Sequence, residues 1–312
     1  MRNYPAHLDA MWQKAIAPRE PDAPTVISTF AGGGGSLTGY MMAGYRDLLA
    51  VEWDDNAVET LRLNWPELDI YHGDIAKLTV DEVLKRTGLK PGELDILDGS
   101  PPCHGFSTAG KRMIDDPRNQ LFKEYVRLLR GLMPKVFVME NVSGMVKGKM
   151  KLVFVEILKE LKASGYKVSA KLLNAMYFHV PQSRERMIFI GVRDDLGIEP
   201  SHPKAESKPI TVREAIGAMG SYTNSSFNWI RQAGKPFQTF TKTKSRSHIV
   251  YDLGGDRELT EGELMAGASF PISYKFMSRE AAIERIGNSV PPLFMEAIAR
   301  HIRGEILGKC NG

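Results

Sequence analysis

A strand that runs directly into four consecutive glycines constrains the fold of this chain most. Residues 25–30 are largely apolar and predict a buried strand, residues 31–36 supply the glycines, and a helix is expected near residues 37–43. Glycine permits a tight turn and lets a ligand approach the backbone closely. This order predicts the nucleotide-binding start of a doubly wound α/β sheet, although a flexible loop can show the same glycine run.

Polar residues follow the next two expected strands. Glu52 ends the strand at residues 48–51, where a carboxylate can accept hydrogen bonds from ribose hydroxyls. Trp53 can lie against a purine, and Asp74, after a short strand at residues 70–72, can accept a bond from an exocyclic amine. An exposed strand end and a turn aspartate are the structural alternatives. We expect an adenosine-like ligand, because the glycine spacing does not favour a nicotinamide dinucleotide.

A Pro-Pro-Cys turn follows the apolar strand expected at residues 94–97. Pro101 and Pro102 end strand pairing, and Cys103 is one of only two cysteines in the chain. In open α/β sheets, ligands bind at the carboxyl ends of the strands. The turn therefore predicts a rigidly held thiol at the ligand-binding edge. A tight turn with an incidentally buried cysteine is the alternative.

A carboxylate and two arginines lie at the boundaries of other expected strands. Glu140 ends the buried strand at residues 136–139, where an unused carboxylate would be costly. Arg184 and Arg186 precede a strand at residues 187–191 and, two residues apart, point the same way. They can bind a carboxylate, a carbonyl or a phosphate, whereas ordinary surface arginines are the alternative.

Composition limits the class of protein. The 312 residues are 43% hydrophobic and 25% charged, with a net charge of +4, which is compatible with a polyanionic partner. Two distant cysteines give neither a disulfide framework nor zinc spacing, so we expect a reducing compartment and no metal. The first 24 residues contain acidic side chains and no apolar run, so we expect neither a signal peptide nor a membrane span.

The composition changes in the middle of the chain. Between residues 193 and 277, Ser, Thr, Lys, Gly and Pro dominate, with scattered aromatic and basic residues that suit nucleic acid. We predict a catalytic, cofactor-binding domain formed by residues 1–191 and 278–312, and a smaller irregular domain at residues 192–277. A helix at residues 291–306 is expected to return to the first domain, and a short helix is expected at residues 257–265. The polar loop at residues 108–119 is a candidate lid.

Together, these motifs resemble the DNA (cytosine-5)-methyltransferases of bacteria and phages. The similarity covers roughly residues 25–303, in the family's order. Its blocks are Phe30-Ala31-Gly32-Gly33-Gly34-Gly35, Glu52-Trp53, Asp74-Ile75, Pro101-Pro102-Cys103, Glu140-Asn141-Val142, Gln182-Ser183-Arg184-Glu185-Arg186, Arg257-Glu258-Leu259-Thr260 with Glu263, and Gly287-Asn288-Ser289-Val290. The chain departs from the family at His104, where many bacterial members have Gln, and in a short interval between Arg186 and Arg257.

The resemblance implies an S-adenosylmethionine-dependent methyltransferase with a Rossmann-like sheet and a smaller DNA-recognition domain. Cys103 would add to C6 of a cytosine flipped out of the duplex, because C5 alone is a poor nucleophile. Glu140 would bind N3 and the exocyclic amine, Arg186 would hold the base carbonyl, and Arg184 would orient the Cys or Glu side chain.

The same resemblance implies two sets of binding residues. Those expected at the cofactor are Phe30, Gly32, Gly33, Gly35, Leu37, Glu52, Trp53, Asp74, Ile75, Ser100, Pro102, Leu121, Asn288 and Ser289. Those expected at DNA are His104, Ser107, Lys111, Arg112, Thr239, Thr241, Lys242, Lys244 and Arg246. Thr239 and Thr241 belong to a segment similar to the family's Pro-x-x-Thr-x-Thr.

Other functions stay open at this point. A transfer RNA cytosine-5 methyltransferase would show the same order of motifs, and a catalytically silent DNA-binding relative would not need Cys103. A dinucleotide oxidoreductase would leave the Pro-Pro-Cys and Glu-Asn-Val blocks without a role. We expect double-stranded DNA as the partner, no membrane contact, a monomer in the cytoplasm of a bacterial or phage-infected cell, and a separately acting cognate restriction endonuclease.

Overall fold

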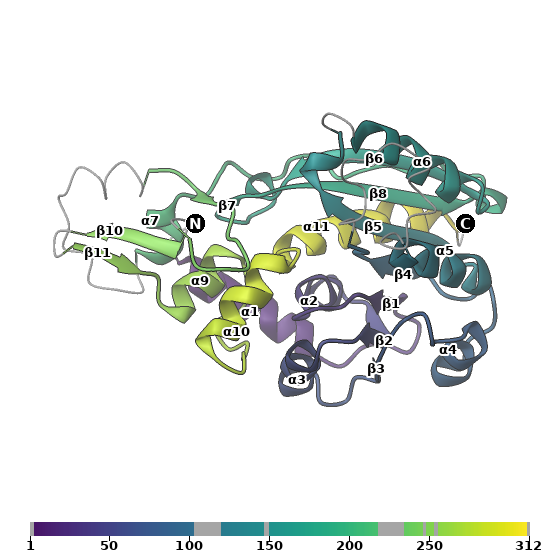
Figure 1. The fold of residues 1–312 in the computed structure, drawn as a ribbon, viewed down its shortest axis with the longest axis horizontal. Coiled ribbons are helices and arrows are strands. Elements are labelled where there is room, and N and C mark those ends of the chain that lie inside the picture. The colour runs from purple at the N-terminus through teal and green to yellow at the C-terminus, as the bar shows by residue number, and fades with distance from the viewer. Residues whose placement is uncertain are drawn as a thin grey trace.

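Seven strands form one twisted sheet in the order β3-β2-β1-β4-β5-β8-β6 (Figure 1). The computed structural model describes residues 3–102, 120–146, 150–217, 234–245, 248–252 and 255–310. The strands of the sheet are β1 (Thr25–Thr29), β2 (Arg46–Glu52), β3 (Ile70–His72), β4 (Ile96–Gly99), β5 (Val136–Val142), β6 (Tyr166–Asn174) and β8 (Glu185–Arg193). Two small pairs lie outside it: β7 (Gln182–Ser183) with β9 (Phe237–Gln238), and β10 (Ile249–Asp252) with β11 (Gly255–Glu258).

The strand order reverses between β1 and β4. β1 pairs in parallel with both β2 and β4, and β5 continues the parallel half of the sheet, whereas β8 is antiparallel to β5 and to β6. In open α/β sheets, this reversal opens a crevice at the carboxyl ends of the strands. The predicted doubly wound α/β fold is confirmed, and its expected ligand edge lies after β1, β2, β4 and β5.

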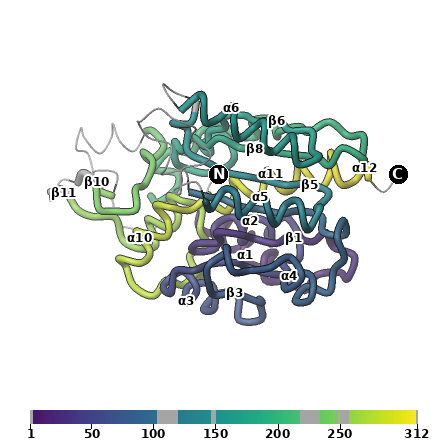
Figure 2. The backbone as a smooth tube through the Cα atoms, turned by 45° about the vertical axis from the view of Figure 1, so that its right-hand side comes forward, coloured from purple at the N-terminus to yellow at the C-terminus, as the bar shows by residue number. Residues whose placement is uncertain are grey.

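Helices cover both faces of the sheet (Figure 2). One face packs against α1 (Tyr4–Ile16), α2 (Gly35–Met42), α3 (Asp55–Asn64), α10 (Arg279–Asn288) and α11 (Pro292–Ile302). The other packs against α4 (Val80–Thr87), α5 (Gln120–Leu132) and α6 (Met150–Lys162). Along β5, Val136 and Val138 face the first layer, and Phe137 and Met139 face the second. A sheet buried on both sides explains why its strands are continuous apolar runs.

The remaining helical elements are short. They are the 3-10 turns η3 (Ser143–Val146), η4 (Ala175–Tyr177) and η5 (Asp194–Leu196), the π-helical turn η7 (Arg303–Leu307), and the helices α7 (Val212–Ile216), α9 (Glu261–Gly267) and α12 (Gly308–Cys310). Within the described ranges, no helix combines the length and apolar character needed to cross a bilayer.

Helix α11, near the C-terminus, returns to the start of the sheet and packs on α2 (Figures 1 and 2). A Cβ atom on Gly39 would lie 2.6 Å from the Pro292 carbonyl oxygen, so α2 and α11 touch through their backbones. The Tyr45 hydroxyl donates to the Ala299 carbonyl over 2.9 Å. The same apolar core includes four residues of the smaller part of the chain, residues 192–277: Phe237, Phe240, Leu264 and Phe270. The proposed domain boundaries stay a prediction.

Two strands extend further than their apolar runs predict. β5 continues to Val142 and β8 begins at Glu185, so Glu140 and Arg186 lie inside paired strands. The helix expected at residues 257–265 is wrong in its first half, because Arg257 belongs to β11. There, a capping box between Thr260 and Glu263 starts α9 only at residue 261.

Asp98 is a buried carboxyl group inside β4. It is 3% exposed, and Oδ1 accepts a hydrogen bond from the Tyr40 hydroxyl over 3.1 Å. Burial raises the pKa of Asp98 well above its usual range; the Tyr40 bond opposes this shift, and the charges of Asp47 and Glu140 add to it. Asp98 therefore favours the protonated form beneath the turn that leads to Cys103.

The stability of the Asp98→Asn variant, relative to wild type, should increase as pH rises. In the unfolded chain the carboxyl ionises near pH 4, whereas the folded chain keeps its proton to higher pH, so the wild type loses stability above that point. Relative to wild type, the midpoint of thermal unfolding should rise between pH 5 and pH 8 by about 2 °C or more. A difference between the two proteins that does not change with pH would contradict a protonated Asp98.

Candidate active site

The turn after β1 presents its backbone at the switch point of the sheet. Gly32 has a φ of +53°, and a Cβ atom there would meet only backbone, at 4.0 Å. A Cβ on Gly33 would lie 2.7 Å from Arg285 Cβ, and one on Gly35 would lie 2.3 Å from the Val290 carbonyl oxygen. Gly32 thus leaves open space, whereas Gly33 and Gly35 permit the close packing of residues 285–290 on the turn.

Glu52 ends β2 with a carboxylate that backbone amides hold in place. Oε2 accepts from the Gly32 amide over 2.7 Å, and Oε1 accepts from the Trp53 and Asp54 amides over 2.8 and 2.9 Å. The residue is 8% exposed. Because two carboxylate oxygens offer about four acceptor positions, one position on Oε2 stays available for a ligand.

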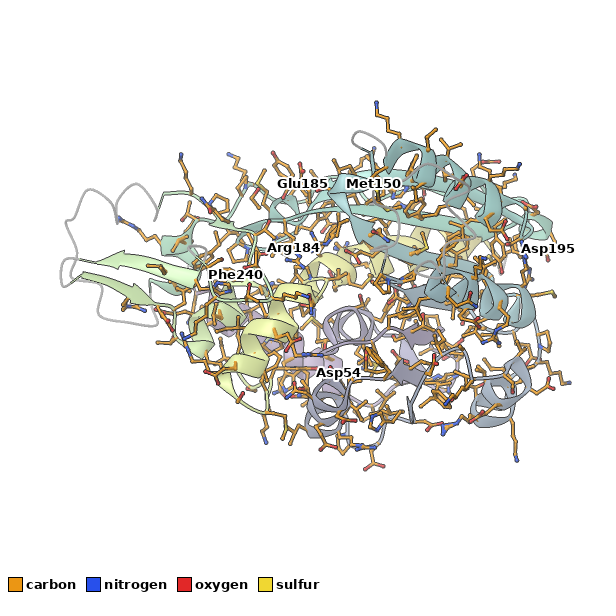
Figure 3. The ribbon with its side chains drawn as sticks, viewed as in Figure 1. Asp54, Met150, Arg184, Glu185, Asp195 and Phe240 are labelled. Atoms are coloured by element: carbon orange, nitrogen blue, oxygen red, sulfur yellow. The ribbon has the colours of Figure 1, made fainter. Side chains whose placement is uncertain are left out.

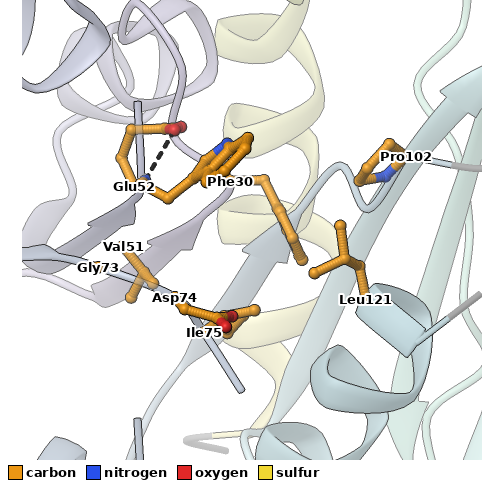
Figure 4. Close-up of a pocket in the computed structure, with 9 residues that line it drawn as sticks. Phe30, Val51, Glu52, Gly73, Asp74, Ile75, Pro102 and Leu121 are labelled. Carbon is orange, nitrogen blue, oxygen red and sulfur yellow. Dashed lines mark hydrogen bonds between the residues drawn. The ribbon is translucent and has the colours of Figure 1, made fainter. Parts of the chain in front are cut away.

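An apolar cavity of about 300 Å³ lies beside Glu52 (Figure 4). Trp53 is 75% exposed at its rim. Asp74 also lines it, and Asp74 Oδ1 accepts a bond from the Ala76 amide over 2.9 Å. The lining consists of Phe30, Val51, Glu52, Trp53, Gly73, Asp74, Ile75, Pro102 and Leu121. Such a shape, apolar with two carboxylates in its lining, suits a flat ring attached to a hydroxylated group.

A second cavity of about 500 Å³ adjoins the first and shares Phe30, Glu52, Trp53 and Pro102 with it. It extends from the glycine turn along Ser100 and Pro101 to Glu140 and Asn141 at the end of β5. Its opposite wall contains Lys242 and residues of α10 and the turn that follows α10. One lining therefore connects the carboxylate of Glu52 with that of Glu140.

Glu140 forms an ion pair with Arg186 in this second cavity wall. Arg186 Nε lies 2.6 Å from Glu140 Oε1, and Glu140 is 7% exposed. The pairing of β5 with β8 sets this contact, since Arg186 lies opposite Val142, two residues beyond Glu140. Asn141 Nδ2 donates to the Pro101 carbonyl over 3.2 Å and ties β5 to the turn before Cys103. Cys103 itself lies outside the described residues.

Arg184 is buried at the junction of three segments. It is 1% exposed, and its Nη1 and Nη2 donate to the carbonyls of Phe240 and Gly287 over 3.1 and 2.9 Å (Figure 3). Burial, together with the charge of Arg186, lowers the pKa of Arg184 to about 9, and the charge of Glu140 opposes this shift. The resemblance assigned Arg184 to orienting the Cys or Glu side chain, whereas its hydrogen bonds join residue 240 to residue 287.

Comparison with known proteins agrees with this arrangement. A sequence profile described as C-5 cytosine-specific DNA methylase matches residues 24–249 and 212–304. The chain belongs to this family. It is 33% identical over 326 residues to the Type II methyltransferase M1.HphI of Haemophilus parahaemolyticus, covering 89% of this chain and 86% of the relative.

Two further proteins resemble this DNA cytosine-5 methyltransferase. The Type II methyltransferase M.AquIA of Picosynechococcus is 41% identical over 204 residues, covering 62% of this chain and 82% of the relative. A crystal structure of a putative DNA modification methyltransferase, encoded within an Escherichia coli prophage, has a TM-score of 0.75 and 21% identity. It covers 91% of this chain and 100% of that chain, and shows that the two share a fold.

Most residues expected at the cofactor line the two cavities of the methylase. In the first lie Phe30, Glu52, Trp53, Asp74, Ile75, Pro102 and Leu121. The second adds Gly32, Gly33, Gly35, Ser100, Asn288 and Ser289. Leu37 lines neither cavity, because it is 1% exposed and packs in the apolar core of α2. The contacts of these residues with a cofactor stay predictions.

The residues expected at DNA are only partly brought together. Thr239 Oγ1 donates to the Ser183 carbonyl over 2.6 Å, and Thr241 Oγ1 donates to the Thr243 carbonyl over 2.8 Å. Lys242 lines the second cavity, whereas Lys244 Nζ lies 3.1 Å from Glu258 Oε1 and is paired within the protein. The others lie outside the described residues: His104, Ser107, Lys111, Arg112 and Arg246.

Sequence reasoning missed Arg285 and Asp54, which also line the second cavity. Arg285 Nη1 lies 3.0 Å from Asp54 Oδ1, across 231 positions of sequence. Asp54 follows the Glu52-Trp53 block, and Arg285 lies two residues before the Gly287-Asn288-Ser289-Val290 block. Their positions beside these blocks were the only available signal, since nothing local indicates that the two charges meet.

Arg184→Lys should weaken the junction between the smaller part and the C-terminal segment. A lysine ammonium cannot reproduce the planar fork that spans two carbonyls, and an unsatisfied buried carbonyl costs about 1–3 kcal/mol. Urea unfolding should detect this loss, and the exposed Arg213→Lys on α7 provides the matched control. Equal stability of Arg184→Lys and wild type would show that these two hydrogen bonds do not support the junction.

Proposed function

We propose that the methylase transfers a methyl group from S-adenosylmethionine to C5 of a cytosine flipped out of duplex DNA. The observation that carries this proposal is the continuous cavity lining that runs from Glu52, past Pro101 and Pro102, to Glu140. A cofactor at one end and a base at the other would meet beside the turn that leads to Cys103. A base inside a duplex cannot reach such a cavity, so flipping is required.

The residues present fit S-adenosylmethionine. The apolar cavity offers the exposed indole of Trp53 as a surface for adenine. The available acceptor position on Glu52 suits a ribose hydroxyl, and the open backbone at Gly32 permits close approach of the remaining part. When bound, S-adenosylmethionine supplies an electrophilic methyl group on a positively charged sulfur.

The chemistry then requires activation of the cytosine ring. We propose that the Cys103 thiolate adds to C6, which gives C5 the character of an enamine carbon. C5 takes the methyl group as its bond to the sulfonium breaks, which leaves S-adenosylhomocysteine. Loss of the C5 proton to solvent water and departure of the thiolate from C6 then give 5-methylcytosine and free Cys103. Glu140 accepts a hydrogen bond from the exocyclic amine and, carrying a proton, donates to N3, which stabilises the negative charge that develops on the ring. Arg186 fixes the Glu140 carboxylate through the 2.6 Å ion pair and directs its remaining donors toward the base carbonyl.

DNA contacts come from the smaller part and from the cavity rim. Lys242 lines the cavity beside the base site, so we assign it to a phosphate near the flipped nucleotide. Thr239 and Thr241 are assigned to the neighbouring DNA backbone.

The relatives are named Type II methyltransferases, from which we infer a role in restriction–modification with a separate endonuclease. Bisulfite sequencing of DNA from cells that express the chain should reveal methylated cytosines at a fixed motif.

Cys103→Ser should abolish methyl transfer while cofactor affinity stays nearly unchanged. A serine hydroxyl is a far weaker nucleophile at neutral pH than a thiolate, and Cys103 is not among the residues assigned to the cofactor, most of which lie at the ends of other strands. Transfer of a tritiated methyl group to DNA measures turnover, and calorimetry measures cofactor binding. Substantial residual turnover would remove Cys103 from its assigned role.

Glu140→Gln should lower kcat by about 100-fold or more, as expected for loss of a group that stabilises developing charge. The amide keeps the shape of the side chain but removes the charge that pairs with Arg186. Single-turnover methyl transfer at saturating DNA and cofactor measures the effect. A change confined to KM for DNA would mean that Glu140 only binds the base.

A further inference from the structure

Arg285 lies on α10 and faces the turn where β2 passes into α3. It is 7% exposed, with Nη1 at 3.0 Å from Asp54 Oδ1 and Nη2 at 2.9 Å from Glu284 Oε1. Its aliphatic part fills the space beside Gly33, where a Cβ atom would lie 2.7 Å from Arg285 Cβ. This side chain therefore contacts the glycine turn and the β2–α3 turn at once.

Asp54 connects this ion pair to the carboxylate assigned to the ribose. Its backbone amide donates to Glu52 Oε1 over 2.9 Å, and its side chain caps α3 by accepting from the Ala57 amide over 2.9 Å. A shift of Asp54 would move a donor to Glu52 and the start of α3 together. The second cavity is lined by Glu52, Asp54, Glu284 and Arg285.

We propose that Arg285 is a positioning residue for the cofactor, which aligns the C-terminal segment with the Glu52 wall of the cavity through its ion pair with Asp54. This inference rests on the proposed function, because it assumes that S-adenosylmethionine binds at Glu52. Cofactor affinity then depends on a residue that belongs to the last part of the chain. Arg285 acts through Asp54 and the glycine turn rather than by touching the base.

Charge makes this contact sensitive to substitution. The guanidinium of Arg285 is buried whereas Asp54 and Glu284 are partly exposed, so its loss leaves two carboxylates at the cavity that only solvent screens. Glutamine at residue 285 keeps much of the aliphatic packing against Gly33 but cannot neutralise either carboxylate. Asparagine at residue 54 removes the charge and keeps the helix cap, since Asn caps helices as well as Asp.

The test uses the full chain and three variants: Arg285→Gln, Asp54→Asn and the double variant. Calorimetry should give a dissociation constant for S-adenosylmethionine that is about ten-fold higher in each single variant, with the double variant no weaker than the singles. KM for the cofactor should rise by a similar factor while kcat at saturating cofactor stays nearly unchanged. Non-additive effects would locate the contribution in the pair itself.

Arg300→Gln is the matched control. Arg300 also pairs with two carboxylates, Glu206 at 2.6 Å and Glu296 at 3.0 Å, but it is exposed on α11 and lines neither cavity. The Arg300→Gln variant should bind the cofactor with the same affinity as wild type. Lower thermal stability of Arg285→Gln and Asp54→Asn with unchanged cofactor affinity would overturn the inference and leave a structural role. Absence of cofactor binding to wild type would instead contradict the proposed function on which it rests.

Discussion

The two hydrogen bonds of the buried Arg184 guanidinium support the arrangement of the side chains that we assign to catalysis. A cation taken out of water needs hydrogen-bond acceptors, and Arg184 uses the carbonyls of residues 240 and 287, which come from separate parts of the chain. Gln182 contributes to the same junction, since its amide donates to the Gly267 carbonyl and accepts from the Phe240 amide. Residues 182, 184 and 186 are two positions apart along an extended segment, so their side chains lie on one side of it. The first two bind the smaller part of the chain, and the third binds Glu140.

Local patterns predicted the parts of the molecule that local geometry determines. Glycines after a strand, an acidic residue at the end of the next strand, and prolines before a cysteine each predicted an element that needs no distant partner. Arg285 and Asp54 were missed because their contact depends on packing between segments far apart in sequence, and the hydrogen bonds of Arg184 depend on such packing too. The role expected for Arg184 stays a prediction. The helix expected at residues 257–265 was wrong in its first half for another reason. A strand ends at Glu258 and a helix starts at Glu261, with only Leu259 and Thr260 between them.

Two neighbouring carboxyl groups, Asp98 and Glu140, differ in burial and in hydrogen-bond and ion-pair partners. Glu140 lies in the cavity wall, where the Arg186 guanidinium is 2.6 Å from its carboxyl oxygen. Asp98 lies deeper in the sheet, and the hydroxyl of Tyr40 donates to it. Burial raises the pKa of Asp98, which disfavours a second negative charge beneath the turn that leads to Cys103.

The packing of α11 on α2 has a consequence for how the protein is made. The layer that covers one face of the sheet combines the first helices of the chain with nearly the last one, and Gly39 touches the backbone of residue 292 directly. Domains acquire their structure as the chain leaves the ribosome, N-terminal part first. Here α11, which covers α2, is translated only after the whole smaller part. Docking of the last helix is therefore the step that completes both the core and the cavity wall formed by residues 284–290.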